Sequence, residues 1–195
     1  MSWLAQLPTP PVATRTPDAA RLADFLRQVD ARLERDVSCV VYGSCAVSLY
    51  LGHRDAQVYI AMTDDIDLSA PVASGLMTAL HQASPTQNPS LEFRVAVSVE
   101  NWLIHPDWRV HLVEVSSHLG LCRLQLYLLH PADLILTKLE RWSDRDFQDA
   151  MELVAHLGFT QAQLTAHLEE ALEYYVGDPV YRGIRENLLD LFDEA

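Results

Sequence analysis

Two carboxylates, Asp65 and Asp67, are the side chains in this sequence best placed to hold a divalent cation. On a β-strand, residues i and i+2 point to the same face, so these two carboxylates would lie side by side. Neighbouring carboxylates repel each other, and a hard cation such as Mg²⁺ or Mn²⁺ relieves that repulsion. The spacing alone is not specific, because Asp144 and Asp146 repeat it, where we interpret it as the start of a helix.

A candidate phosphate site lies at Gly43-Ser44, where the β-rich run 37–42 (VSCVVY) turns into a helical pattern. The first turn of a helix presents unpaired backbone N–H groups and the positive end of the helix dipole. Glycine lets a ligand approach the backbone closely, so the turn suits an anion such as phosphate. The simpler alternative, that Ser44 only caps the helix, stays open.

Lys138 is the only lysine, beside 13 arginines, which raises the question whether its position requires an ammonium group. At helical spacing it lies within the apolar stripe formed by Leu134, Ile135, Leu139 and Trp142. A buried ammonium needs an anion, which would be a nucleotide phosphate or a carboxylate of the metal site. The alternative is that the side chain extends along the surface and keeps its charge in water.

Five further residues are candidates for supporting or metal-binding roles. Asp146 either completes a capping box that begins at Ser143 or pairs with Lys138 or Arg145, and both interpretations stay open. A third metal ligand would be a glutamate on a neighbouring strand, with a solvated strand residue as the alternative. The residues are Arg145, Asp146 and Asp149 as supporting residues, and Glu100 or Glu114 as third ligand, with Glu114 expected on a buried face.

The elements that position these residues follow from hydrophobic spacing and from turn residues. The order of helices and strands predicts an α+β fold, with a small mixed β-sheet flanked by helices over 17–130. An extended arm at 1–16 precedes this core, and a helical C-terminal subdomain at 131–195 follows it. The predicted helices are 17–35, 46–51, 73–83, 131–142, 144–157, 160–175 and 179–192, and the predicted strands are 37–42, 57–69, 91–99, 109–115 and 122–129.

Composition narrows the classes of function. With 14 basic and 27 acidic residues the net charge is −13, which argues against a broad basic face for nucleic acid. No run of apolar residues is long enough to span a membrane, and the N-terminus lacks the charged start of a signal peptide. The three cysteines lack CxxC spacing and the eight histidines are scattered, which argues against a zinc site. The cysteines also give no disulfide framework, so a reducing cytoplasm fits best.

The combination of these motifs resembles the nucleotidyltransferase superfamily, the polymerase-beta-like fold. Its signature is a hydrophobic residue followed by Gly-Gly or Gly-Ser, a short helix, and a strand with Asp-hydrophobic-Asp. Residues 130–157 further resemble the downstream part of bacterial AbiEii-like toxins and of uncharacterised nucleotidyltransferase-like proteins. The residues that carry the two resemblances are Tyr42, Gly43, Ser44, Asp65, Ile66 and Asp67, and then Asp133-Leu134, Lys138-Leu139, Arg145-Asp146 and Asp149.

The resemblance implies transfer of NMP from an NTP to an RNA end or a protein hydroxyl, including the role of a toxin with an antitoxin partner. It implies that Asp65 and Asp67 hold Mg²⁺, while Gly43 and Ser44 cradle the β- and γ-phosphates and Lys138 adds a cation. Neither candidate for the third carboxylate has a recognisable motif around it. A second hypothesis therefore stays open, in which the protein is a non-catalytic nucleotide-binding or protein-interaction module. Phosphate-ester hydrolysis at the same acidic pair is a third.

Overall fold

The computed structural model describes residues 4, 17–51, 58–63, 72–83, 91–96, 102–175 and 183–193. The chain divides into two compact units. The sheet unit comprises residues 11–100 and 112–129, and the helical unit comprises residues 1–10, 101–111 and 130–195. Most of the predicted arm at 1–16 lies outside the described residues, and the domain boundaries predicted above stay predictions.

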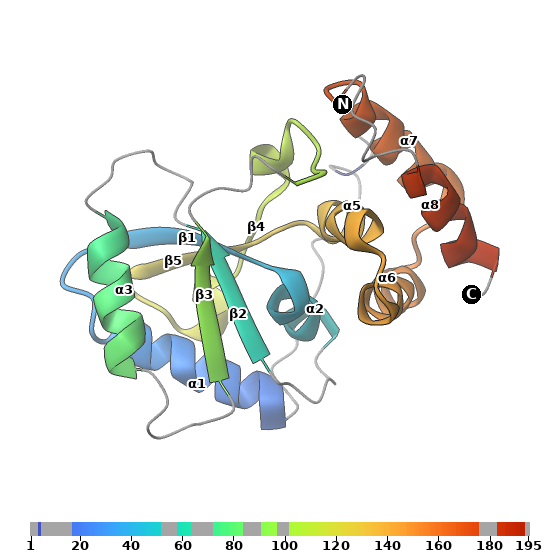
Figure 1. Ribbon diagram of the computed structural model, residues 1–195. Coiled ribbons are helices and arrows are strands. Elements are labelled where there is room, and N and C mark those ends of the chain that lie inside the picture. The colour runs from blue at the N-terminus through green and yellow to red at the C-terminus, as the bar shows by residue number, and fades with distance from the viewer. Residues whose placement is uncertain are drawn as a thin grey trace. The chain divides into compact units, whose positions relative to one another are not determined.

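The sheet unit contains a five-stranded mixed sheet with the strand order β3-β2-β1-β5-β4 (Figure 1). The pairs β1–β5 and β2–β3 are parallel, whereas β1–β2 and β4–β5 are antiparallel. The predicted α+β class with a mixed sheet is therefore confirmed. The strands are β1 (Val37–Tyr42), β2 (Val58–Thr63), β3 (Leu91–Ala96), β4 (Val113–Glu114) and β5 (Leu124–Leu128).

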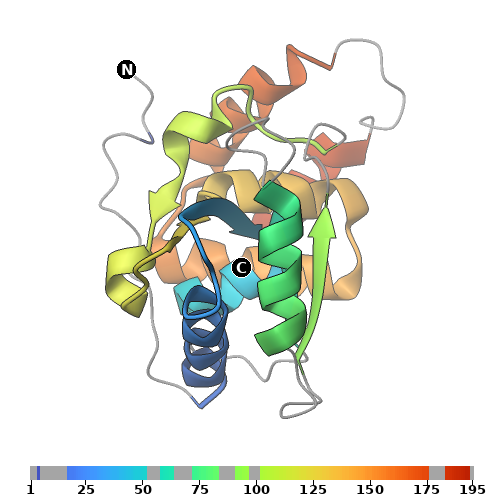
Figure 2. The ribbon, with the colours of Figure 1, turned by 90° about the vertical axis from the view of Figure 1, so that its left-hand side faces the viewer.

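The described part of the same unit contains the helices α1 (Pro17–Asp30), α2 (Gly43–Leu51), α3 (Val72–Ala83) and α4 (Ser116–Leu119). Helices α1 and α3 lie side by side, as both ribbon views show, and α2 packs against β1 and β2 (Figures 1 and 2). The apolar spacing predicted for α1 is correct, because its Leu22, Leu26 and Val29 are fully buried.

The prediction that the first helix reaches Arg35 is wrong, because α1 ends at Asp30. The Asp30 carboxylate accepts hydrogen bonds from the backbone N–H groups of Cys122, Arg123 and Leu124, at 3.0, 2.7 and 2.7 Å. These residues lead into β5, so a contact distant in the sequence fixes the end of the helix.

The predicted strand at 109–115 is also largely wrong. Residues Trp108–His111 form a 3₁₀ helix, η2, and only Val113–Glu114 pair as β4. The alternation of apolar residues predicts a strand. In the structure Trp108 is 3% exposed and Val110 is 79% exposed, so the tryptophan is the side chain that η2 buries.

The helical unit contains α5 (Pro131–Arg141), α6 (Asp144–Leu157), α7 (Gln161–Leu172) and α8 (Ile184–Asp193). Residues close in the sequence set the starts of α6 and α7. Ser143 caps α6, and Thr160 with Gln163 forms a capping box at α7. Among the residues that the structure describes, no helix is long and apolar enough to cross a membrane.

Candidate functional site

The Gly43-Ser44 turn is the one accessible part of α2. Every residue from Cys45 to Leu51 is buried, whereas Gly43 and Ser44 are partly exposed. Gly43 and Ser44, at the positive end of the helix dipole, are thus the residues of α2 that are not buried. This arrangement suits an anion and fits the predicted phosphate contact, which stays a prediction.

Gly43 is required by its backbone conformation. Its φ is 63°, in the left-handed region that residues with a Cβ adopt only with strain. We expect Gly43→Ala to lower the free energy of unfolding by about 1–2 kcal/mol. The check is urea denaturation, with Gly75→Ala as the matched control, because Gly75 is an exposed glycine within α3 whose added Cβ meets no atom within 4 Å. A Gly43→Ala variant as stable as the wild type would contradict the assignment.

The residues beside this turn do not supply a nucleophile. Burial raises the pKa of the Cys45 thiol well above its usual range, and the side chain is fully buried. Burial likewise raises the pKa of Tyr42 to about 12, so the phenol stays neutral at physiological pH. Because the thiolate is the reactive form of cysteine, covalent chemistry at Cys45 is disfavoured.

Asp65 and Asp67 lie outside the described residues, but the strand that precedes them is described. β2 pairs with β1 in antiparallel fashion, Thr63 lies opposite Val40, and Gly43 follows β1. Gly43 lies three residue steps beyond Val40 along the chain, which corresponds to roughly 10 Å. The two motif segments therefore follow adjacent strands. From Ala61 to Thr63, β2 leads away from Gly43, because the two strands are antiparallel. The distance between the acidic pair and the Gly43-Ser44 turn therefore depends on the residues that follow Thr63.

Glu114 occupies a different environment from the one expected. It is exposed rather than buried, because Val113 and Val115 on either side of it point inward. Its carboxylate accepts hydrogen bonds from the Ser116 backbone N–H at 2.7 Å and the Ser117 hydroxyl at 3.4 Å, and these contacts lower its pKa. Glu114 also lies on β4, three strand spacings or roughly 14 Å from β2. Glu100, the other candidate third ligand, lies outside the described residues.

Lys138, Asp146 and Asp149 come together in the helical unit. The Lys138 ammonium lies 2.6 Å from Asp149 Oδ2 and 3.0 Å from Asp146 Oδ1, and the residue is 1% exposed. The alternative in which the charge reaches water is therefore excluded. Burial lowers the pKa of Lys138 to about 8 against the opposing charge of Asp146, so the amine is still mainly protonated at pH 7.

Asp146 combines the two roles that the sequence left open. Its backbone N–H donates to the Ser143 hydroxyl at 3.3 Å, and its carboxylate accepts from Arg141 at 2.5 Å as well as pairing with Lys138. Its ion-pair partners are thus Lys138, as one alternative predicted, and Arg141, whereas Arg145 is exposed. These contacts lower the pKa of Asp146 to about 2, although burial opposes them. A contact of Lys138 with phosphate stays a prediction.

A histidine cluster around Asp133 is a feature that sequence reasoning missed. The histidines are far apart along the chain and show no metal-binding spacing, so only the tertiary structure reveals that they meet. Among the described residues, no group of three or more histidine, cysteine, aspartate or glutamate side chains has the geometry of a metal site. The four histidines are His105, His111, His130 and His167.

The fold and the turn define an α+β protein with an accessible helix start that suits phosphate. Comparison with family models is more specific, because the model described as "Nucleotidyltransferase of unknown function (DUF6036)" matches residues 20–172. The chain belongs to this family, which confirms the predicted nucleotidyltransferase class. No curated protein and no solved structure matches the chain. The closer resemblance to AbiEii-like toxins stays a prediction.

Proposed function

We propose that this protein is a metal-dependent nucleotidyltransferase that transfers NMP from an NTP to an RNA or protein hydroxyl. The observation that carries the proposal is the accessible start of α2 at Gly43-Ser44, within a chain whose family is that of nucleotidyltransferases. In this proposal the backbone N–H groups of the turn bind the β- and γ-phosphates of the NTP.

The proposed metal ligands are Asp65 and Asp67. Carboxylate oxygens are the donors that Mg²⁺ and Mn²⁺ prefer, and a bound ion would neutralise negative charge on the triphosphate as pyrophosphate leaves. The part of the chain that the structure describes contains no metal cluster of its own. The two aspartates are therefore the donor set on which the proposal depends.

The strand register favours Glu100 over Glu114 as a third ligand. β2 and β3 pair in parallel, from Val58 opposite Leu91 to Thr63 opposite Ala96, with a constant offset of 33 residues. Glu100 follows Asp67 by the same offset of 33 residues in the sequence. Glu114 lies on β4, with β1 and β5 between it and β2, so we propose Glu100 for this role.

The acidic composition bears on the acceptor. A net charge of −13 opposes the approach of RNA unless a partner supplies basic surface. We therefore favour a protein hydroxyl as the acceptor. The protein would act in the bacterial cytoplasm, and an antitoxin protein is a candidate for a further partner.

The test is nucleotide transfer by the full chain with Mg²⁺ or Mn²⁺ and each of the four NTPs. Label at the α-phosphate is expected to become covalently attached to an acceptor, whereas label at the γ-phosphate is not, because it leaves with pyrophosphate. The acceptor is offered as total tRNA, as a bacterial lysate, or as the protein alone. Attachment of the γ-label would instead indicate phosphoryl transfer.

Two other outcomes would overturn the proposal. Release of phosphate from a phosphate-ester substrate, without any label attached from an NTP, would indicate phosphate-ester hydrolysis at the acidic pair. No transfer with any NTP or acceptor, while an NTP still raises the melting temperature, would indicate a non-catalytic nucleotide-binding module.

A further inference from the structure

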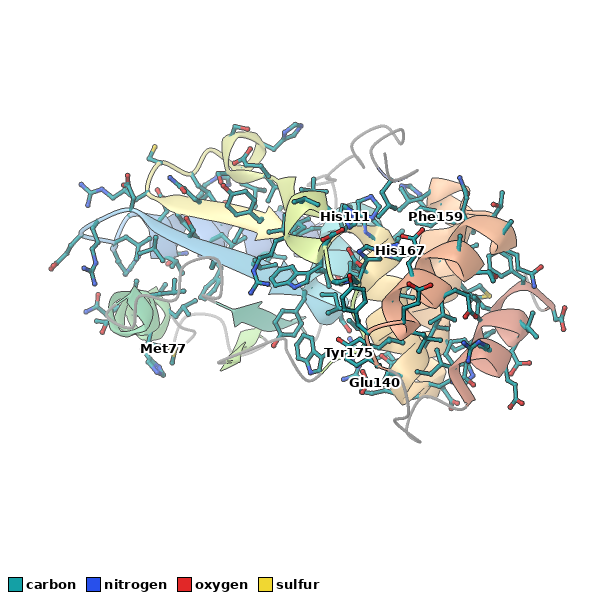
Figure 3. All side chains as sticks on the ribbon, turned by 90° about the horizontal axis from the view of Figure 1, so that it is seen from above. Met77, His111, Glu140, Phe159, His167 and Tyr175 are labelled. Atoms are coloured by element: carbon teal, nitrogen blue, oxygen red, sulfur yellow. The ribbon has the colours of Figure 1, made fainter. Side chains whose placement is uncertain are left out.

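Four of the eight histidines in the chain gather around one buried carboxylate, Asp133, which is 0% exposed. Asp133 lies in the first turn of α5, and all the residues of this histidine cluster belong to the helical unit. The cluster joins three parts of that unit: the segment 102–111, α5 and α7. His111 and His167 are seen close together in Figure 3.

The rings are close enough to influence one another electrostatically. His105 and His167 are stacked, with ring centroids 4.7 Å apart and planes 5° from parallel. The His111 ring lies 5.2 Å from that of His105, 6.0 Å from that of His167 and 6.4 Å from that of His130. Two positive charges at such distances inside a protein repel each other strongly.

Asp133 makes unequal contacts with these rings. Its Oδ1 lies 2.8 Å from His167 Nε2 and accepts the backbone N–H of His105 at 3.3 Å. Its Oδ2 faces His111 Nδ1 at 3.6 Å, and neither of these two buried atoms has a hydrogen-bond partner. The interactions with His111 and His167 lower the pKa of Asp133, against the effect of burial.

Among the residues that the structure describes, few other charges face the cluster. From α7, Glu170 reaches His105 Nε2 at 3.0 Å, but this carboxylate is 56% exposed. On the segment itself, Asp107 donates its backbone N–H to His105 Nδ1, and its neighbours bring no further buried anion. At the start of α5, His130 accepts the backbone N–H of Ala132. Asp133 can therefore balance one imidazolium, and within the described part of the unit we find no second buried carboxylate in contact with the rings.

We propose that the histidine cluster is a pH-sensitive contact. It holds the segment 102–111 on α5 and α7 at neutral pH and releases this segment when the cluster is protonated. Half of the chain's histidines and one buried carboxylate are the protonatable groups of the cluster. This pH-sensitive contact does not depend on nucleotide transfer.

The other end of the segment is held by contacts without histidine. The Tyr175 hydroxyl donates to the Trp102 carbonyl at 2.8 Å, and the Leu103 N–H donates to Glu140 at 2.9 Å. Release on acidification should therefore begin at residues 105–111, while residues 102–103 stay bound longer. Trp108 is buried within the part that is released first, so its fluorescence reports the event.

The direction of the pH effect follows from His130. Burial lowers its pKa from 6.5 to about 4, so between these values the unfolded chain binds more protons than the folded one. The stability that depends on a neutral His130 is consequently fully present above about pH 6.5 and is lost as the pH falls toward 4. Asp133 acts in the same direction at lower pH, because its lowered pKa stabilises the fold only while it is ionised.

The test compares melting temperatures at about pH 7.5 and 5.5 for the wild type and two double variants. His130→Asn keeps a side-chain cap on α5, and His167→Gln keeps a donor for Asp133, so this pair removes two imidazole rings while keeping the cap and the donor. The matched control is His118→Asn with His156→Gln, because both side chains are exposed. The wild type and the control should lose at least about 3–6 °C on acidification, and the cluster variant at most half of that.

Hydrogen exchange of the wild type, corrected for intrinsic rates, gives a second readout that needs no variant. At the lower pH, residues 105–111 should lose protection before α1 and α3, which contain no residue of the cluster. Equal loss throughout the chain would overturn the proposal, and so would equal pH dependence in all three proteins. Stabilisation by Zn²⁺ that disappears in the cluster variant would also overturn it, since the cluster would then be a metal site.

Discussion

Replacing Asp65 or Asp67 by Asn is expected to lower the rate of NMP transfer by roughly 10²–10³-fold, which corresponds to the loss of about 3–4 kcal/mol of metal-derived stabilisation. Asparagine keeps the size of the side chain but removes the negative charge that holds a divalent cation. The measurement is the initial rate of α-label transfer at saturating NTP and Mg²⁺. The melting temperature without metal should not fall, because removing one of two neighbouring like charges relieves repulsion.

Asp64→Asn is the matched control for this prediction. Asp64 adjoins the pair in the sequence, but strand alternation assigns it to the opposite face. Its replacement should change the transfer rate less than about twofold, within the small effect expected for surface substitutions. If all three variants lose activity equally, the pair has no special role. If Asp65→Asn and Asp67→Asn both keep wild-type activity, the proposed metal site is wrong.

Replacing Lys138 by Met is expected to destabilise the fold by about 3–5 kcal/mol, since two buried carboxylates lose their cation. For a chain of this length the melting temperature should fall by roughly 6–20 °C. Methionine has a similar length and fills the same space, so the loss reports charge rather than packing. The ammonium contacts both Asp146 and Asp149, neither of which is exposed to water.

Arg141→Met serves as the control, because Arg141 pairs with the same Asp146 but its side chain is 70% exposed. Its loss should cost less than about 1 kcal/mol. Adding Asp149→Leu to Lys138→Met should restore part of the stability, because Asp146 keeps Arg141 and Ser143 as partners. A Lys138→Met variant with wild-type stability and weakened NTP binding would instead indicate that the ammonium acts on phosphate.

Local features of the fold were predictable where the controlling residues are close in sequence. The bounds of β1 and α6 agree with the predictions, because Gly43 ends the strand, Ser143 caps the helix and Gly158, with φ 70°, stops it. The Gly43-Ser44 turn was found for the same reason. A glycine with positive φ and a polar residue at a helix start act over only a few residues.

Predictions failed where distant residues decide the outcome. Helix α1 stops at Asp30 because its carboxylate binds the backbone ahead of β5, some ninety residues later. The alternation at 109–115 was mistaken for a strand, because burial of Trp108 in the helical unit outweighs a local preference. Neither contact leaves a pattern in the sequence near the element that it controls.

The sequence by itself determined the fold class, most helix starts and stops, and the candidate residues Gly43, Ser44, Asp65, Asp67 and Lys138, because residue type and spacing are local quantities. Only the tertiary structure decided that Lys138 lies between Asp146 and Asp149, that Glu114 faces solvent and that four histidines meet at Asp133. These facts depend on which segments pack together. Packing is set by burial and hydrogen bonding summed over the whole chain, so no single motif encodes it.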